Sequence, residues 1–329
     1  PKSIRDLAKS RMLFAPFPLP STFLLLFFQN RKLVLSLSKY HKLLKLSRPL
    51  HLLLAALTYT LGASIPAYLG QPLQSPIFWL GLALVLLAQL SMAWLVEIFR
   101  PHNEPLVEGE TPQQKETLRN NMLIILIASL TTYTILAYLL FTNFHLTLTT
   151  FYFLIFSIVL TFAHAIPPVR LMNRGFGELT LAAHIAYVVP SVAFLLQTGE
   201  NHRLLTILLF PLTALALAFF LILNFTTFTA DQKYHRATLL RSLTWERAVP
   251  FHHNLIIFAY FIFAISPLFG FSFSVIWPAF LTLPFAILQI LFLRHISMGG
   301  KPNWPLLTVT ALAVFGLTTY FLTLTFWLR

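Results

Sequence analysis

The sequence contains no cysteine and few charged residues, and each scarcity excludes a class of protein. Without cysteine the chain can form no disulfide framework, thiol nucleophile or cysteine-ligated metal or iron–sulfur centre. Only 10% of the residues are charged, against about 25% in soluble domains, whereas 57% are hydrophobic. Eleven glycines and an aromatic content of 15% exclude collagen-like and disordered chains. The composition therefore predicts a membrane protein.

Long apolar runs predict an all-α, polytopic membrane protein with nine transmembrane helices. A helix needs about 20 predominantly apolar residues to cross a bilayer. The seventh and eighth runs are separated only by Gly270 and Phe271, where we expect a hairpin. The predicted helices cover 49–70, 77–98, 120–141, 146–166, 178–198, 204–226, 249–270, 272–293 and 305–328.

The positions of the basic residues predict the orientation of the nine helices. Nine crossings place the N-terminus and the loops after the second, fourth, sixth and eighth helices on one side. Of the 23 Lys and Arg residues, 21 fall on that side, and only Arg203 and Arg329 fall on the other. The positive-inside rule then predicts N-in, C-out, with the long polar loops on the cytoplasmic side or its organellar equivalent.

Residues 1–45 differ from the rest of the chain, and we expect them to lie at the membrane surface. The first 48 residues carry ten Lys or Arg, and the prolines at positions 16, 18 and 20 disfavour a helix there. The segment is too long and too charged for a signal peptide. Its partners are predicted to be anionic lipid or an acidic membrane subunit, not nucleic acid. Residues 46–329 form one nine-helix membrane domain in this interpretation.

Polar residues gather in three segments on the predicted inner side, at 97–119, 167–178 and 224–246. Carboxylates and arginines in facing loops can hold Mg²⁺ and a diphosphate, since Mg²⁺ prefers oxygen ligands and Arg matches phosphate oxygens. The alternative is that these segments form an ordinary basic cytoplasmic surface.

Motifs in these segments resemble those of the UbiA superfamily of intramembrane prenyltransferases, over residues 42–328. The most specific match is to its quinone and chlorophyll-synthase branches, at 167–171 and 174–179; 46–50 and 104–112 also match. The resemblance implies a nine-helix bundle and aspartate-rich motifs after helices 2 and 6. It also implies Mg²⁺-dependent transfer of a prenyl chain from a diphosphate to an aromatic acceptor.

The aspartate-rich motifs are degraded in this sequence. The resemblance places Gln89, Leu90, Ala93 and Glu97 on the first motif, Asn224, Thr227 and Asp231 on the second, and His164, Met172 and Glu104 where the family has Tyr, Lys and Arg. Glu97 and Asp231 are therefore the residual candidates for Mg²⁺. The candidates for binding diphosphate are Arg100, Arg119, Arg170, Arg174, Lys233 and Arg236.

Several of these residues have a second interpretation. Glu97 can end its helix and pair with Arg100, and Asp231 can cap a short helix. His164 and His184 lie at membrane depth, where an ionisable residue is a functional-site hypothesis. They are candidate axial ligands to the metal of a chlorin or haem, or neutral histidines bonded to a neighbouring helix.

The losses favour a protein that has lost most Mg²⁺–diphosphate chemistry. We expect it to bind an isoprenoid-tailed ligand (a quinone, carotenoid or (bacterio)chlorophyll) as a subunit of a larger photosynthetic or respiratory membrane complex. The alternative is an active, divergent prenyltransferase that uses an aromatic or chlorin acceptor. A transporter is disfavoured, because the helices contain almost no paired ionisable residues at the midplane.

Overall fold

The computed structural model describes residues 41–107 and 109–328. The chain divides into two units, Pro1–Lys45 and Leu46–Arg329, and the second contains the helices discussed below. The predicted surface segment 1–45 lies almost wholly outside the described residues, and its role stays a prediction.

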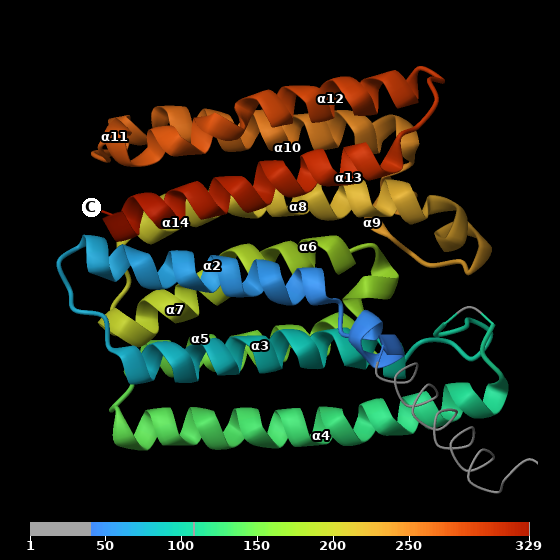
Figure 1. The fold of residues 1–329 in the computed structure, drawn as a ribbon, viewed down its shortest axis with the longest axis horizontal. Coiled ribbons are helices and arrows are strands. Elements are labelled where there is room, and N and C mark those ends of the chain that lie inside the picture. The colour runs from blue at the N-terminus through green and yellow to red at the C-terminus, as the bar shows by residue number, and fades with distance from the viewer. Residues whose placement is uncertain (1–40, 108, 329) are drawn as a thin grey trace, which may run out of the picture. The chain divides into compact units, whose positions relative to one another are not determined.

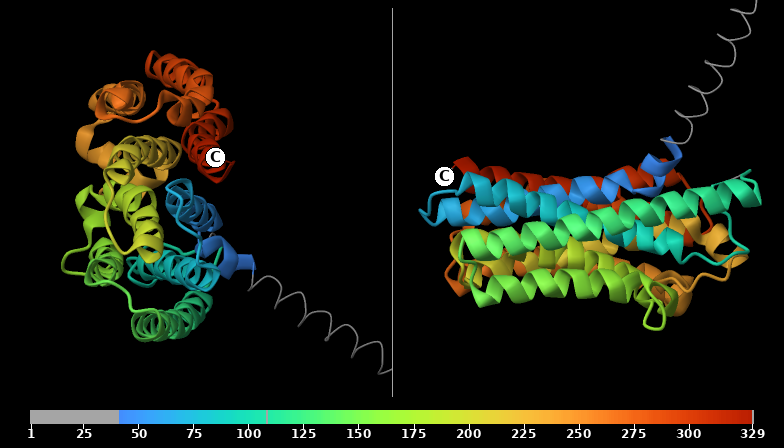
Figure 2. Two further views of the ribbon diagram at one scale, coloured as in Figure 1. Left: turned by 90° about the vertical axis from the view of Figure 1, so that its left-hand side faces the viewer. Right: turned by 90° about the horizontal axis from the view of Figure 1, so that it is seen from below.

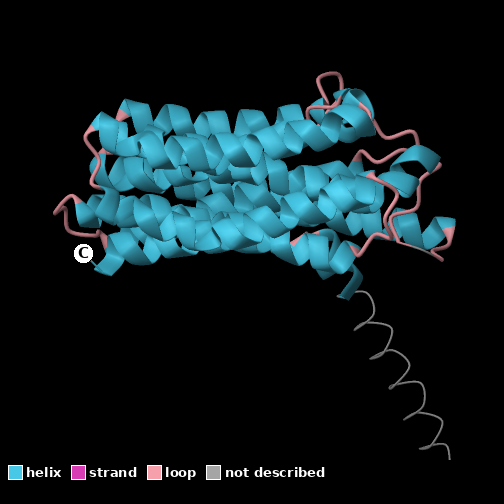
Figure 3. Cartoon of the chain, turned by 90° about the horizontal axis from the view of Figure 1, so that it is seen from above, coloured by secondary structure: helices cyan, strands magenta, loops and turns pink. Residues whose placement is uncertain are grey.

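Within the described residues, nine helical segments are long and apolar enough to cross a membrane, which confirms the predicted helix count. The loops between them lie at the two ends of the bundle (Figures 1 and 3). The predicted hairpin around Gly270 is also present, between Phe269 and Phe273. The helices are α2 (Pro49–Tyr68), α3 (Ser75–Ile98), α4 (Pro112–Asn143), α5 (Leu148–Ala165), η2 (Leu171–Arg174), α6 (Gly177–Ala183), η3 (His184–Val188), α7 (Val189–Thr198), α8 (Arg203–Lys233), α9 (Leu239–Leu243), α10 (Trp245–Ile265), η4 (Ser266–Phe269), α11 (Phe273–Ile276), η5 (Trp277–Thr282), α12 (Leu283–Ser297), α13 (Trp304–Leu312), η6 (Ala313–Leu317) and α14 (Thr318–Leu328).

The fifth and sixth membrane crossings form the centre of the bundle. The apolar windows of α6–η3–α7 and α8 are 83% and 78% buried, whereas that of α4 is only 22% buried. In the end-on view of Figure 2, α4 lies at one edge and α10–α12 lie at the opposite edge. Helices at the edges present apolar side chains to lipid, so their hydrophobicity does not require burial in protein.

The fifth membrane crossing, α6–η3–α7, changes its helical pitch just before Pro190. Pro190 has no N–H to donate along the helix, and a single π turn, η3, precedes it. Gly62 of α2 packs directly against Pro190. A Cβ at position 62 would lie only 2.1 Å from the Pro190 carbonyl oxygen, so α2 and α7 can approach this closely only with glycine there.

Two helices extend beyond the predicted apolar runs. The α4 helix begins at Pro112, eight residues earlier than expected, and is opened by a capping box between Thr111 and Gln114. The α8 helix continues to Lys233. The predicted loop from Asn224 onwards is therefore helix up to that point, because hydropathy marks the membrane-embedded part of a helix and not the polar turns beyond it.

Candidate ligand pocket

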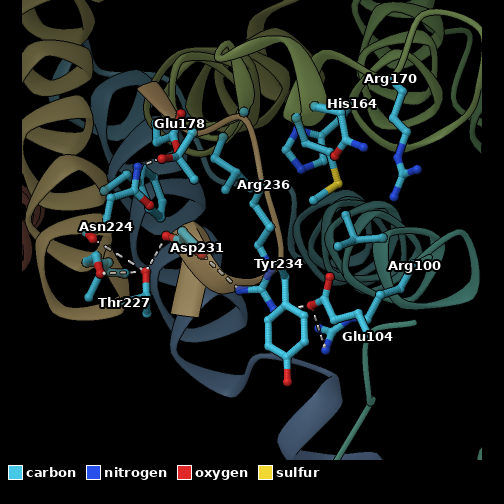
Figure 4. A pocket seen from close by; sticks show the side chains of 18 of the residues that line it. Arg100, Glu104, His164, Arg170, Glu178, Asn224, Thr227, Asp231, Tyr234 and Arg236 are labelled. Carbon is cyan, nitrogen blue, oxygen red and sulfur yellow. Dashed lines mark hydrogen bonds and ion pairs between the residues drawn. The ribbon is translucent and has the colours of Figure 1, made fainter. Parts of the chain in front are cut away.

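The ends of α2, α3, α5, α6 and α8 surround a pocket of about 330 Å³ (Figure 4). Its inner wall is apolar and includes Val96, Leu181, Phe220 and Leu223. Its polar wall contains side chains from segments far apart in the sequence. These are Arg48, His51, Arg100, Glu104, His164, Arg170, Asn173, Glu178, Asn224, Thr227, Asp231, Tyr234, His235, Arg236 and Thr238.

At the end of α3, Glu97 is paired with two arginines. Its side chain is only 3% exposed. Oε1 lies 3.2 Å from Arg48 Nη2, and Oε2 contacts Arg100, one helical turn further on. The predicted alternative, in which Glu97 ends its helix and pairs with Arg100, is therefore present in the structure.

The ion pairs continue from Arg100 to the end of α8. Arg100 Nη1 lies 3.3 Å from Glu104 Oε1, and Glu104 also accepts a hydrogen bond from Arg236. Arg236 Nη1 donates to Asp231 Oδ1 at 3.0 Å, and Thr227 Oγ1 donates to Asp231 Oδ2 at 2.8 Å. We call Arg48, Glu97, Arg100, Glu104, Arg236 and Asp231 the ion-pair network.

Charge alternates along this network, and its carboxylates are buried. Burial alone would lower the pKa of Arg236, but hydrogen bonds and charge from Glu104 and Asp231 outweigh it and raise that pKa above its ordinary value. Asp231 lies within α8, seven residues after Asn224 and four after Thr227, so all three share one helix face. Asp231 therefore does not cap a short helix.

Glu178 forms a second, separate set of contacts. Asn224 Nδ2 donates to its Oε1, and the Leu239 amide donates to its Oε2 at 3.1 Å. Its charge is thus balanced by N–H donors from α8 and from the start of α9. Glu178 lies in the matched motif at 174–179 but is not among the residues predicted for the site; its place in that motif is the signal that could have identified it.

Arg170 lies on the side of the pocket opposite Asn224 and Asp231 in Figure 4. No carboxylate in the described part of the chain forms an ion pair with it, and its Nε is buried without a hydrogen-bond partner. Burial lowers the pKa of Arg170, and the negative charge of Glu104, which forms no ion pair with it, only partly opposes this effect.

Two buried histidines line the inner part of the pocket. His164 Nδ1 lies 2.5 Å from Thr180 Oγ1, which itself donates to the Gly177 carbonyl. His51 packs edge-to-face on Phe220, and its Nδ1 has no partner. The sequence did not single out His51, because a histidine one turn into an apolar helix carries no distinguishing pattern.

His184 and Gln89 lie away from the pocket wall, deeper in the helix bundle. His184 Nδ1 lies 2.9 Å from Gln89 Oε1, and its Nε2 lies 2.9 Å from Ser157 Oγ. Both ring nitrogens are therefore engaged by neighbouring helices. This is the second of the two interpretations, a neutral histidine bonded within the protein, and it leaves no nitrogen free for the metal of a chlorin or haem.

The structure separates the six predicted diphosphate ligands into two groups. Arg100, Arg170 and Arg236 line the pocket, as does the motif-equivalent Met172. Arg119 donates to the Arg100 carbonyl instead, and Arg174 donates to the Pro168 carbonyl. Lys233 lies over the Tyr234 ring, 5.2 Å from its centroid, and is not part of the pocket wall.

The carboxylates present do not fit a Mg²⁺ site. Among residues 41–107 and 109–328, no group of three or more His, Asp or Glu is placed to hold a metal ion. Both oxygens of Glu97 face arginines, and both oxygens of Asp231 have partners within the chain. A cation would have to displace an arginine from each carboxylate.

Comparison with solved structures identifies the fold. A UbiA homologue from Archaeoglobus fulgidus bound to GPP and Mg²⁺ aligns with a TM-score of 0.59 and 16% identity, over 87% of this chain and 99% of that one. This chain has the UbiA fold. The Cd²⁺-bound form of the A. fulgidus protein aligns with a TM-score of 0.58 and 17% identity over the same shares. The form bound to DMAPP and Mg²⁺ gives 0.58 and 15%, over 85% of this chain and 99% of that one. No protein-family model and no curated protein matches the sequence.

Proposed function

We propose that this chain is a UbiA-superfamily membrane protein that binds an isoprenoid-tailed ligand and has lost Mg²⁺–diphosphate chemistry. One observation carries the proposal: Glu97 and Asp231, the only carboxylates left at the motif positions, are both paired with arginines. A carboxylate neutralised by arginine offers little to a metal ion, because displacing a buried partner leaves a charge uncompensated.

The charge of the site also disfavours a diphosphate. Four arginines line the pocket: Arg48, Arg100 and Arg236 form ion pairs with Glu97, Glu104 and Asp231, whereas Arg170 forms none with a described carboxylate. A prenyl diphosphate carries about three negative charges. As its allylic C–O bond breaks, more negative charge develops on the leaving diphosphate, and preorganised positive charge is needed to stabilise it. Loss of one such contact typically slows a reaction by about 10²–10³-fold. A pocket in which three of the four arginines are already paired with carboxylates therefore suits binding better than ionisation of an allylic diphosphate.

The apolar wall supports an isoprenoid tail. Leu181, Phe220 and Leu223 continue from the polar wall towards the buried centre of the bundle. The head group would then lie at the helix ends and the tail among the helices. A quinone, carotenoid or (bacterio)chlorophyll satisfies this description, and we place the chain in a larger membrane complex with the pocket on the cytoplasmic side or its organellar equivalent.

Two measurements on the chain purified in mild detergent test the proposal. Solvent extraction with mass spectrometry should recover a stoichiometric isoprenoid lipid without added substrate. Geranyl diphosphate, Mg²⁺ and an aromatic acceptor should give no Mg²⁺-dependent release of diphosphate.

The alternative of an active transferase predicts different results. Release would be stimulated by Mg²⁺, abolished by Glu97→Gln and by Asp231→Asn, and retained in Glu116→Gln, which removes an exposed carboxylate on α4. That pattern would overturn the proposal.

A further inference from the structure

One arginine of the pocket, Arg170, forms no ion pair with a described carboxylate. Three of its arginines, Arg48, Arg100 and Arg236, belong to the ion-pair network. Arg170 lines the same pocket outside that network, with its Nε buried and without a hydrogen-bond partner. The structure thus presents a buried donor and a positive charge towards the space that a ligand would fill.

A second observation points to a polar group beside Arg170. His51 is only 8% exposed, lines the pocket, and has no partner for its Nδ1. Buried polar atoms without partners in a native fold require an explanation, and a ligand head group supplies one here.

Resting on the proposed function, and narrowing its isoprenoid-tailed ligand to one with an acidic in place of a neutral head, we infer that this head carries a single negative charge on oxygen and is bound by Arg170 without a metal ion. The head lies beside His51, and the chain attached to it packs on Leu181 and Phe220. One negative charge matches the one unpaired guanidinium. Each further charge would face the carboxylates of Glu104, Glu178 and Asp231 with no free cation to balance it.

A series of three probes that share one tail tests this charge rule. Geraniol is neutral, geranic acid carries one negative charge, and geranyl diphosphate carries about three. Binding to the delipidated full chain in detergent with EDTA is measured by isothermal titration calorimetry. The acid should bind about 10–100-fold more tightly than the alcohol, since a charge-assisted hydrogen bond contributes that much. The diphosphate should bind no more tightly than the acid.

Variants assign the effect to Arg170. Arg170→Gln should reduce the affinity for geranic acid to that for geraniol, while geraniol binding stays unchanged and reports a folded pocket. Arg170→Lys should keep the preference for the acid. The control is Arg247→Gln, which removes an exposed arginine from the first turn of α10, outside the pocket, and should change none of the affinities.

The outcomes separate this inference from the proposed function. Equal affinity of the wild type for acid and alcohol, or an unchanged preference in Arg170→Gln, would overturn the inference and leave isoprenoid binding intact. Tightest binding of geranyl diphosphate in EDTA would also overturn the inference, whereas tightest binding only when Mg²⁺ replaces EDTA would overturn the proposed function itself.

Discussion

Replacement of Glu104 by glutamine tests whether ion pairs hold the pocket together. The Glu104 side chain is only 4% exposed and contacts both Arg100 and Arg236, which follow α3 and α8. Removing one partner of a fully buried ion pair costs about 3–5 kcal/mol. Here the cost is smaller, because Arg100 keeps Glu97, Arg236 keeps Asp231, and the Arg236 side chain is 31% exposed to water. We expect Glu104→Gln to destabilise the fold by about 1–3 kcal/mol.

Thermal unfolding of the purified chain in detergent measures this cost. A loss of about 1–3 kcal/mol corresponds to a fall in Tm of roughly 2–10 °C. Glu116→Gln, at an exposed site on α4, should change Tm little. A double-mutant cycle with Arg236→Gln should give a coupling energy of about 1–3 kcal/mol, as expected for residues in contact.

Additive effects of the two substitutions, or a Glu104→Gln variant as stable as the Glu116→Gln control, would refute the network as a stabilising element. EDTA provides a further check, because a network closed by arginines should unfold at the same temperature with and without it.

Two further substitutions test the packing of the central helices. Gly62→Ala should destabilise the protein by about 1–3 kcal/mol, because its new Cβ would overlap the Pro190 carbonyl and push α2 from α7. Fluorescence-detected gel filtration after a heat step should show less folded protein. A wild-type elution profile would contradict the assigned contact. His184→Leu should lower the stability of the fold by about 1–3 kcal/mol, because it removes the hydrogen-bond partner of Gln89 and Ser157. The lipid recovered by solvent extraction should be unchanged. Its loss from a folded variant would instead identify His184 as an axial ligand.

The fold was predictable because its signals are local. The length of an apolar run and the side on which basic residues fall can both be read without knowing any long-range contact. The helix ends were less predictable. Residues 224–233 are polar enough to indicate a loop, yet they continue α8. Asn224 contacts Glu178 of a distant segment, and Asp231 contacts Arg236 just beyond the end of the helix.

The ion pairs of the pocket could not be predicted from the sequence for a different reason. Glu104 and Arg236 are 132 residues apart, and nothing in either segment identifies the other as its partner. Arg170 and Arg174 lie in one short turn, but only the first lines the pocket, since the second donates to the Pro168 carbonyl. Which arginine lines the pocket is decided by loop conformation and not by residue type.

The ion pairs bear on the proposed loss of metal-binding carboxylates. Loss of metal-binding carboxylates without compensation would leave several arginines buried and unpaired, a state that costs several kcal/mol per charge. Instead Arg48, Arg100 and Arg236 are all matched, and Glu104, at a position where the UbiA resemblance implies arginine, joins two of them. The ends of α3 and α8 are thus connected by side chains alone. Among the arginines that line the pocket, only Arg170 has no ion pair with a described carboxylate, and the proposed monoanionic ligand depends on that difference.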